Sequence, residues 1–126
     1  IGLGEAIKFI ENIDFHQLAN YEQHLSVLMA EKLAEFPLLE VYGGSKKVAP
    51  IFAFNIKNIH HYDLAELLSE NGILVRSGHL CNQSLMNFLK IDGCVRASLS
   101  IYNSEEEINN FIHALKKVVK FLSKSV

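Results

Sequence analysis

The strongest pattern in this sequence is an amphipathic helix near the end of the chain, over residues 104–122. Its apolar residues recur at the 3.6-residue period of an α-helix: Ile108, Phe111, Ile112, Leu115, Val118, Val119 and Leu122. Ser104 and Glu107 have the spacing of a capping box, and the charges change from acidic at the start to basic at the end, as the helix dipole favours. A helix with one apolar face must bury that face, so the chain needs a second layer of structure.

The second layer is predicted to be a β-sheet. Residues 51–57 alternate, with Phe52, Phe54 and Ile56 on one side, which is the pattern of a strand with one apolar face. Three further strands are expected at residues 38–42, 73–76 and 94–102.

The remaining segments are predicted to be helices and short connections. Helices are expected over residues 3–10, 15–35, 62–71 and 84–89. A turn is expected at Gly43 and Gly44, a solvated loop at residues 45–47 and a polar loop at residues 77–82. Together these elements predict an α+β fold, with about four strands in a mixed sheet and helices packed on one face, in a single domain over residues 1–126.

Composition excludes several classes of function. The net charge of -2 argues against nucleic acid or an anionic membrane as the main partner. Unbroken apolar runs reach only four residues, whereas a membrane-spanning helix needs about 20 predominantly apolar ones. The two cysteines are too few for a disulfide framework, which favours a reducing, cytoplasmic setting. The chain opens at Ile1 within a helical pattern and without an initiator Met, so we expect it to be the tail of a longer polypeptide.

Chemistry-bearing side chains concentrate between residues 73 and 98. A predicted strand ends at Arg76, a loop containing glycine presents His79 and Cys81, and a short helix follows at once. The cations and the helix start near Cys81 favour its thiolate, which is the nucleophilic form of cysteine. The alternative is that Cys81 is a small buried hydrophobe, and this is the interpretation we favour for Cys94, at the start of an apolar strand.

Two arginines flank this loop. Arg76 and Arg96 each follow an apolar strand residue. The planar guanidinium group binds a carboxylate with two parallel hydrogen bonds, so we expect at least one of the two to hold an anionic ligand. A structural ion pair is the alternative for either arginine.

The histidines do not predict a metal centre. A set made of His60, His61, His79 and Cys81 has none of the spacings that are usual for zinc ligands, so no metal site is expected. His16, His24 and His113 lie on predicted helices, and we expect all three at the surface.

The functional region resembles a known family. The segments that carry the resemblance are Arg76-Ser77-Gly78-His79-Leu80-Cys81, Leu85-Met86 and Arg96-Ala97-Ser98, with flanking matches at Phe52-Ala53-Phe54-Asn55, His61-Tyr62-Asp63, Tyr102-Asn103 and Gly2-Leu3-Gly4. In this order they resemble the C-terminal segment of SufS-type (group II) cysteine desulfurases and the related selenocysteine lyases, which are pyridoxal-phosphate enzymes of the class V aminotransferase group. Leu80 departs from the usual second histidine before the cysteine, and Asn82 and Ser84 stand where alanine and proline are common.

The resemblance implies a role for each candidate residue. Cys81 would be the catalytic nucleophile, which attacks the sulfur of the substrate and carries it as a persulfide while alanine leaves. Arg96 would hold the α-carboxylate of the substrate, and Arg76 and His79 would support the loop. The chain would be the small C-terminal domain of a fold-type I enzyme, and the lysine that carries the cofactor would lie upstream, so the chain alone is expected to be inactive.

The resemblance also implies partners. These are pyridoxal phosphate as cofactor, L-cysteine or selenocysteine as substrate, a protein that accepts the sulfur for iron–sulfur cluster assembly or a related pathway, and a second copy in a homodimer. Two alternatives stay open at this point. One is a class V relative, such as an epimerase or lyase, in which Cys81 is incidental. The other is a stand-alone module that docks a sulfur carrier.

Overall fold

The computed structural model describes residues 2–43 and 49–123, and within them five helices and four strands follow one another. The elements are α1 (Gly2–Glu11), α2 (Phe15–Leu33), β1 (Leu39–Tyr42), β2 (Ile51–Ile56), α3 (His61–Glu70), β3 (Arg76–Gly78), α4 (Gln83–Leu89), β4 (Cys94–Ser98) and α5 (Glu105–Leu122). None of these helices combines the length and the apolar character that a membrane-crossing helix requires. The expected turn at Gly44 and the loop at residues 45–47 lie outside the described residues.

The four strands form one sheet in the order β1-β2-β4-β3. All three pairings between the described strands are antiparallel, so the expectation of a mixed sheet is wrong, whereas the α+β class is confirmed. The reason is the position of β4. In the chain, β2 precedes α3 and β3 follows it, and these two strands run in the same direction. In the sheet, β4 lies between them and pairs with both.

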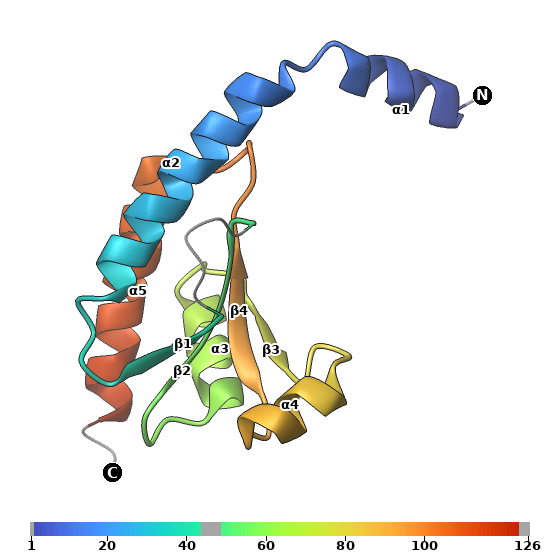
Figure 1. Cartoon of the computed structure of the whole chain (residues 1–126). Helices are drawn as coiled ribbons and strands as arrows, with labels where there is room; N and C mark the ends of the chain where they lie inside the picture. Colours follow the sequence, from blue (N-terminus) through green and yellow to red (C-terminus); the bar gives the residue numbers. More distant parts are fainter. Residues whose placement is uncertain (1, 44–48, 124–126) are drawn as a thin grey trace.

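Helices α2, α3 and α5 cover one face of the sheet, and Figure 1 shows α2 and α5 side by side along it. The strands present Phe54 and Ile56 from β2 and Val95 and Ala97 from β4 to these helices. The helices contribute the rest of the buried cluster, including Leu25, Met29, Leu33, Leu64, Leu68, Ile108, Phe111 and Leu115. Burying each such side chain stabilises the fold by roughly 1.5–3 kcal/mol, so this layer provides the rigid base of the molecule.

Helix α5 follows the sequence prediction closely. Ser104 Oγ accepts a hydrogen bond from the Glu107 N–H (3.2 Å), and Glu107 Oε2 accepts one from the Ser104 N–H (2.9 Å), which completes the capping box. The predicted apolar stripe is buried at five of its seven positions and half-buried at Val119 and Leu122. The amphipathic pattern therefore identified both the helix and the face that it buries.

Two strands differ from their expected bounds by more than one residue. Strand β3 begins at Arg76, because the Ile73 N–H donates to the Leu68 carbonyl and Gly72 adopts a φ of +78°, so residues 73–75 continue from the end of α3. Strand β4 ends at Ser98 rather than at Tyr102, because the following residues turn toward α5, held by the Ser100 N–H, which donates to Asn103 Oδ1 (2.8 Å). Hydrophobic periodicity cannot detect either change of direction.

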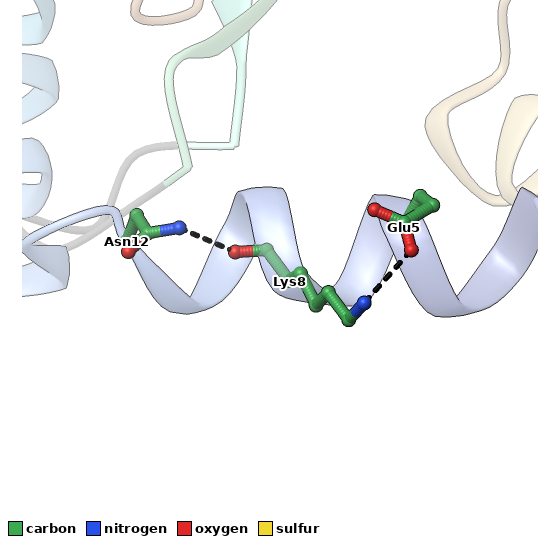
Figure 2. Close-up of polar contacts among 3 residues, drawn as sticks. All are labelled: Glu5, Lys8 and Asn12. Carbon is green, nitrogen blue, oxygen red and sulfur yellow. Dashed lines mark hydrogen bonds and ion pairs between the residues drawn. The ribbon is translucent and has the colours of Figure 1, made fainter.

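Helix α1 projects away from the sheet at the far end of α2 (Figure 1). None of its residues is buried, and the apolar side chains of Leu3, Ile7, Phe9 and Ile10 are exposed. Figure 2 shows that its polar contacts are local: Lys8 Nζ lies 2.8 Å from Glu5 Oε1, and Asn12 Nδ2 donates to the Lys8 carbonyl (2.7 Å). Among residues 2–43 and 49–123, the polar contacts of this helix are local, and its apolar side chains stay exposed.

Candidate active site

The face of the sheet opposite α2, α3 and α5 carries the candidate residues. Successive residues of a strand point to opposite faces, so Arg96 of β4 points away from the side of Val95 and Ala97. We call this surface the Arg face. Its register positions are Ala53 and Asn55 on β2, Arg76 and Gly78 on β3, and Cys94 and Arg96 on β4.

Arg76 and Arg96 are direct register partners on β3 and β4, so their side chains leave the Arg face next to each other. Like charges opposite each other destabilise a sheet unless an anion compensates them. Within residues 2–43 and 49–123 neither guanidinium forms an ion pair, and the Nε atom of Arg96 is buried without a hydrogen-bond partner. This arrangement favours the binding of an anionic ligand over the structural ion pair.

The loop after β3 holds Cys81 in a tight turn. The Asn82 N–H donates to the His79 carbonyl (2.9 Å), and the two residues between them, Leu80 and Cys81, have φ values of +54° and +60°. Positive φ at both central residues is the geometry of a type I′ turn, which glycine and asparagine normally occupy. Backbone strain of about 1–3 kcal/mol per residue is typical of functional sites. The Cys81 thiol is exposed in this turn, as the nucleophile hypothesis requires.

Asn82, one of the three departures from the family pattern, has a structural role. Its Oδ1 atom accepts a hydrogen bond from the Leu85 N–H (3.2 Å), which caps α4. Met86 is buried and anchors this helix, whereas Leu85 and Phe88 are exposed. The turn that carries Cys81 therefore leads directly into a capped and anchored helix.

The base of the Cys81 loop is packed against the start of α3. A Cβ atom added at Gly93 would collide with the imidazole of His61, and one added at Gly78 would lie 3.1 Å from Tyr62 Oη. These two glycines allow α3 to approach the ends of β3 and β4 closely. Sequence reasoning missed the burial of His61, although its position three residues before Leu64 and seven before Leu68 places it on the buried face of α3.

Cys94 differs from Cys81 in its exposure to solvent. It is buried, as predicted, and burial raises the pKa of its thiol, while Arg96 acts in the opposite direction. Nearby, Asn55 Nδ2 donates to the Gly93 carbonyl (2.8 Å) and to Tyr42 Oη (3.3 Å). Cys94 is therefore a packed thiol next to a polar cluster.

The structure groups the possible metal ligands differently from the set considered in the sequence. His79 and Cys81 are not grouped with His60 and His61 as possible metal ligands in the described part of the chain, and Asp92 joins those two histidines instead. Sequence spacing could not reveal Asp92, because it lies more than 30 positions from its partners. The other three histidines are exposed as predicted: His16, His24 and His113.

Known proteins are similar to this chain in sequence and in fold. Residues 1–111 match the aminotransferase class-V family. A probable cysteine desulfurase of Staphylococcus aureus (strain Mu50) is 39% identical over 98% of the chain. The apo structure of a cysteine desulfurase from Thermococcus onnurineus NA1 superimposes with a TM-score of 0.87 at 37% identity over 94% of the chain. The cysteine desulfurase CsdA from Escherichia coli gives 0.87 at 27% identity over 95%.

These matches confirm the resemblance stated from residues 76–98 and the α+β fold that it implied. The chain spans about 30% of the length of these relatives. The chain therefore corresponds to one part of each relative.

Proposed function

The chain belongs to the aminotransferase class-V family, and from this premise we propose that it is the small C-terminal domain of a SufS-type cysteine desulfurase. In this proposal Cys81 takes a sulfur atom from L-cysteine, or selenium from selenocysteine, and alanine is released. The observation that carries the proposal is the exposed Cys81 thiol in a strained turn, at the end of a strand whose neighbour bears Arg96.

Arg96 is proposed to bind the α-carboxylate of the substrate. Its side chain is half-buried, and its Nε atom has no hydrogen-bond partner. A carboxylate that binds in the two-pronged mode would satisfy that donor and would neutralise part of the charge that Arg96 shares with Arg76. Arg76 and His79 are both exposed at the two ends of the same short segment, and we assign them the supporting role around the loop.

The residues of this chain do not fit the attachment of pyridoxal phosphate. The cofactor forms its covalent link with a lysine, and the described positions of the Arg face, where the substrate would bind, include no lysine. We therefore propose that the rest of a longer protein binds the cofactor, whose chemical contribution is to accept electrons from the substrate. The chain alone should then release no alanine from L-cysteine.

The sulfur transfer itself needs only one group from this chain. A bond forms between Cys81 Sγ and the substrate sulfur, and the bond between that sulfur and the substrate β-carbon breaks. The electron pair of the broken bond, together with a proton, completes the methyl group of alanine. Cys81 ends as a persulfide, and no external oxidant or reductant is consumed. An exposed thiolate on a protruding turn suits this step, because both the substrate and a later acceptor must reach it.

We also propose where this domain meets its surroundings. The exposed apolar side chains of α1 offer a surface for packing against the cofactor-binding part of the protein. The complete protein would act as a homodimer in the cytoplasm and would pass its sulfur to an acceptor protein for iron–sulfur cluster assembly or a related pathway.

The test uses the complete polypeptide that contains this chain, purified with pyridoxal phosphate. With L-cysteine supplied, Cys81→Ser should abolish both alanine release and persulfide formation, because the substituted hydroxyl cannot form a persulfide. Cys94→Ala is the matched control and should retain both. Equal alanine release by the wild type and Cys81→Ser would contradict the proposal and would favour a class V relative in which Cys81 is incidental.

A further inference from the structure

A group of three possible metal ligands lies where the start of α3 meets the segment before β4. His60 caps α3, His61 is its first residue, and Asp92 lies two residues before β4. One ligand atom from each residue can be chosen so that all three lie within 4.8 Å of one another. We propose that His60, His61 and Asp92 form a binding site for a divalent transition-metal ion, with zinc as the ion that this donor set suits best.

The spacing of the donors supports this site. His60 Nε2 lies 3.6 Å from Asp92 Oδ2. Zinc binds nitrogen and carboxylate oxygen at about 2.0–2.2 Å, so neighbouring ligands of a tetrahedral ion are about 3.3 Å apart. A small movement of the exposed Asp92 side chain would bring this pair to that distance. The ring centroids of His60 and His61 are 4.4 Å apart, so the two imidazoles are neighbours, and the exposed His60 ring would turn to direct its in-plane lone pair at an ion that His61 also binds.

A second, independent observation is an orphaned polar atom. His61 is 4% exposed, and its Nδ1 atom is buried without a hydrogen-bond partner in the part of the chain that the structure describes. Burying such an atom without a partner costs free energy. His61 lines a hollow of about 290 Å³ together with His60 and Asp92. The same hollow includes Asn55, whose Oδ1 atom is also buried and unpartnered. Two residues with unpartnered buried polar atoms, one from β2 and one from α3, therefore line the same small hollow.

The charges of the three donors suit a divalent ion. The neutral imidazole is the form that binds metal ions. Two neutral imidazoles and one carboxylate would leave a charge of +1 on a divalent ion, and water would complete its coordination.

Binding through His60 Nε2 would exchange one interaction for another. His60 Nδ1 accepts a long hydrogen bond from the Tyr62 N–H (3.3 Å), which caps α3. When a metal ion binds at Nε2, the ring proton moves to Nδ1, and this cap is lost. The ion would instead tie the start of α3 to the turn before β4, directly beneath the glycines that support the Cys81 loop. Asparagine at position 60 would preserve the cap and remove the imidazole, which gives a clean variant.

The test is a titration of the metal-free protein with ZnCl₂, followed by calorimetry, with Cys81→Ser in every sample so that the exposed thiol cannot bind the ion. We expect one Zn²⁺ per chain, and we expect His60→Asn and Asp92→Asn each to weaken binding at least about tenfold. His113→Asn, which removes an exposed histidine on α5, should leave binding unchanged. Zinc should also raise the melting temperature of the parent but not of the two ligand variants.

Either of two results would overturn the site. The parent protein would show no zinc binding, or it would bind with the same affinity after both His60→Asn and Asp92→Asn. Because Asp92 is exposed and His60→Asn keeps the helix cap, both variants should fold, and the melting temperature without zinc checks this directly. The outcome does not depend on the proposed desulfurase activity, because binding is measured without substrate.

Discussion

Cys81 and Cys94 show how differently one residue type behaves in two regions of the same small molecule. Cys81 lies in a turn with positive φ values and exposes its thiol to solvent. Cys94 lies in the paired strand β4, opposite Gly78, with 1% of its surface exposed. The comparison teaches that accessibility and backbone conformation, rather than the residue type, separate an exposed cysteine, as the proposed nucleophile must be, from a packed one.

The same contrast extends to the two faces of the sheet. Val95 and Ala97 of β4 face the helices and are buried in the core, whereas the intervening Arg96 points to the Arg face and has an unpartnered donor. The apolar side chains of one face are thus buried against the helices, and the other face carries two arginine charges that an anionic ligand can neutralise. Four experiments, from the largest expected effect to the smallest, test this division.

The largest effect is expected on the helix-covered face. Phe54 is fully buried and makes an edge-to-face contact with Phe111, with ring centroids 6.3 Å apart. Phe54→Ala should lower the free energy of unfolding by about 3–5 kcal/mol, because it removes a large side chain and leaves a cavity. Arg96→Gln on the opposite face should change it by less than about 1 kcal/mol. Urea unfolding of both variants measures the difference, and similar losses would break the contrast between the faces.

The second experiment compares the two thiols in the native protein. Iodoacetamide should modify Cys81 at least about a hundredfold faster than Cys94, because Cys94 becomes accessible only when the structure opens. The raised pKa of Cys94 slows its reaction further, since the thiolate is the form that reacts. Mass spectrometry of timed samples gives both rates. Comparable rates would show that Cys94 is accessible to the reagent in the folded protein. The control is full unfolding in urea, which should make the two rates equal.

The third experiment tests the support beneath the loop. Gly93→Ala should destabilise the protein by about 1–3 kcal/mol, because the added Cβ collides with the buried His61 and overpacks the site. Gly4→Ala is the matched control in the exposed helix α1, where an added Cβ meets nothing within 4 Å. That substitution should stabilise the helix by up to about 1 kcal/mol. Thermal unfolding compares the two, and a neutral Gly93→Ala would mean that His61 does not hold the base of the loop.

The smallest effect is a dependence of stability on pH. The pKa of His61 is lowered in the folded protein, so the unfolded chain binds a proton more readily. Stability from this residue is therefore fully present above the ordinary histidine pKa of about 6.5 and decreases as the pH falls toward the lowered value. Urea midpoints between pH 7.5 and pH 5, measured with a chelator present, should show a decrease that His61→Gln reduces and that the exposed His113→Gln does not. A parallel decrease in all three proteins would assign it to other groups.

Much of the fold could be predicted because it depends on local patterns. The stripe and capping box of α5 and the alternation of β2 both depend on residues that are close together in the sequence. Arg76, His79, Cys81 and Arg96 could be selected as candidates because their residue types and order suit the proposed chemistry. The antiparallel sheet could not be predicted in the same way, since it depends on the insertion of β4 between β3, the preceding strand, and β2, which is distant from it in sequence.

The features that were missed depend on contacts over long distances or on backbone geometry. Gly93 and His61 are 32 positions apart, and only the folded chain shows that they touch. The positive φ values of Leu80 and Cys81 contradict the ordinary preference of these residues, so no propensity would indicate them. Asp92 gains a possible role as a ligand only when the turn before β4 reaches the start of α3.

The most direct test of the account is to locate the sulfur after reaction. The complete polypeptide, loaded with pyridoxal phosphate, would be mixed with L-cysteine, stopped with a persulfide-trapping alkylating reagent and digested with trypsin. The two cysteines then fall in separate peptides, residues 77–90 and residues 91–96. The account predicts one extra sulfur atom on the peptide that contains Cys81. Extra sulfur on the Cys94 peptide, or alanine release without extra sulfur on either peptide, would contradict it.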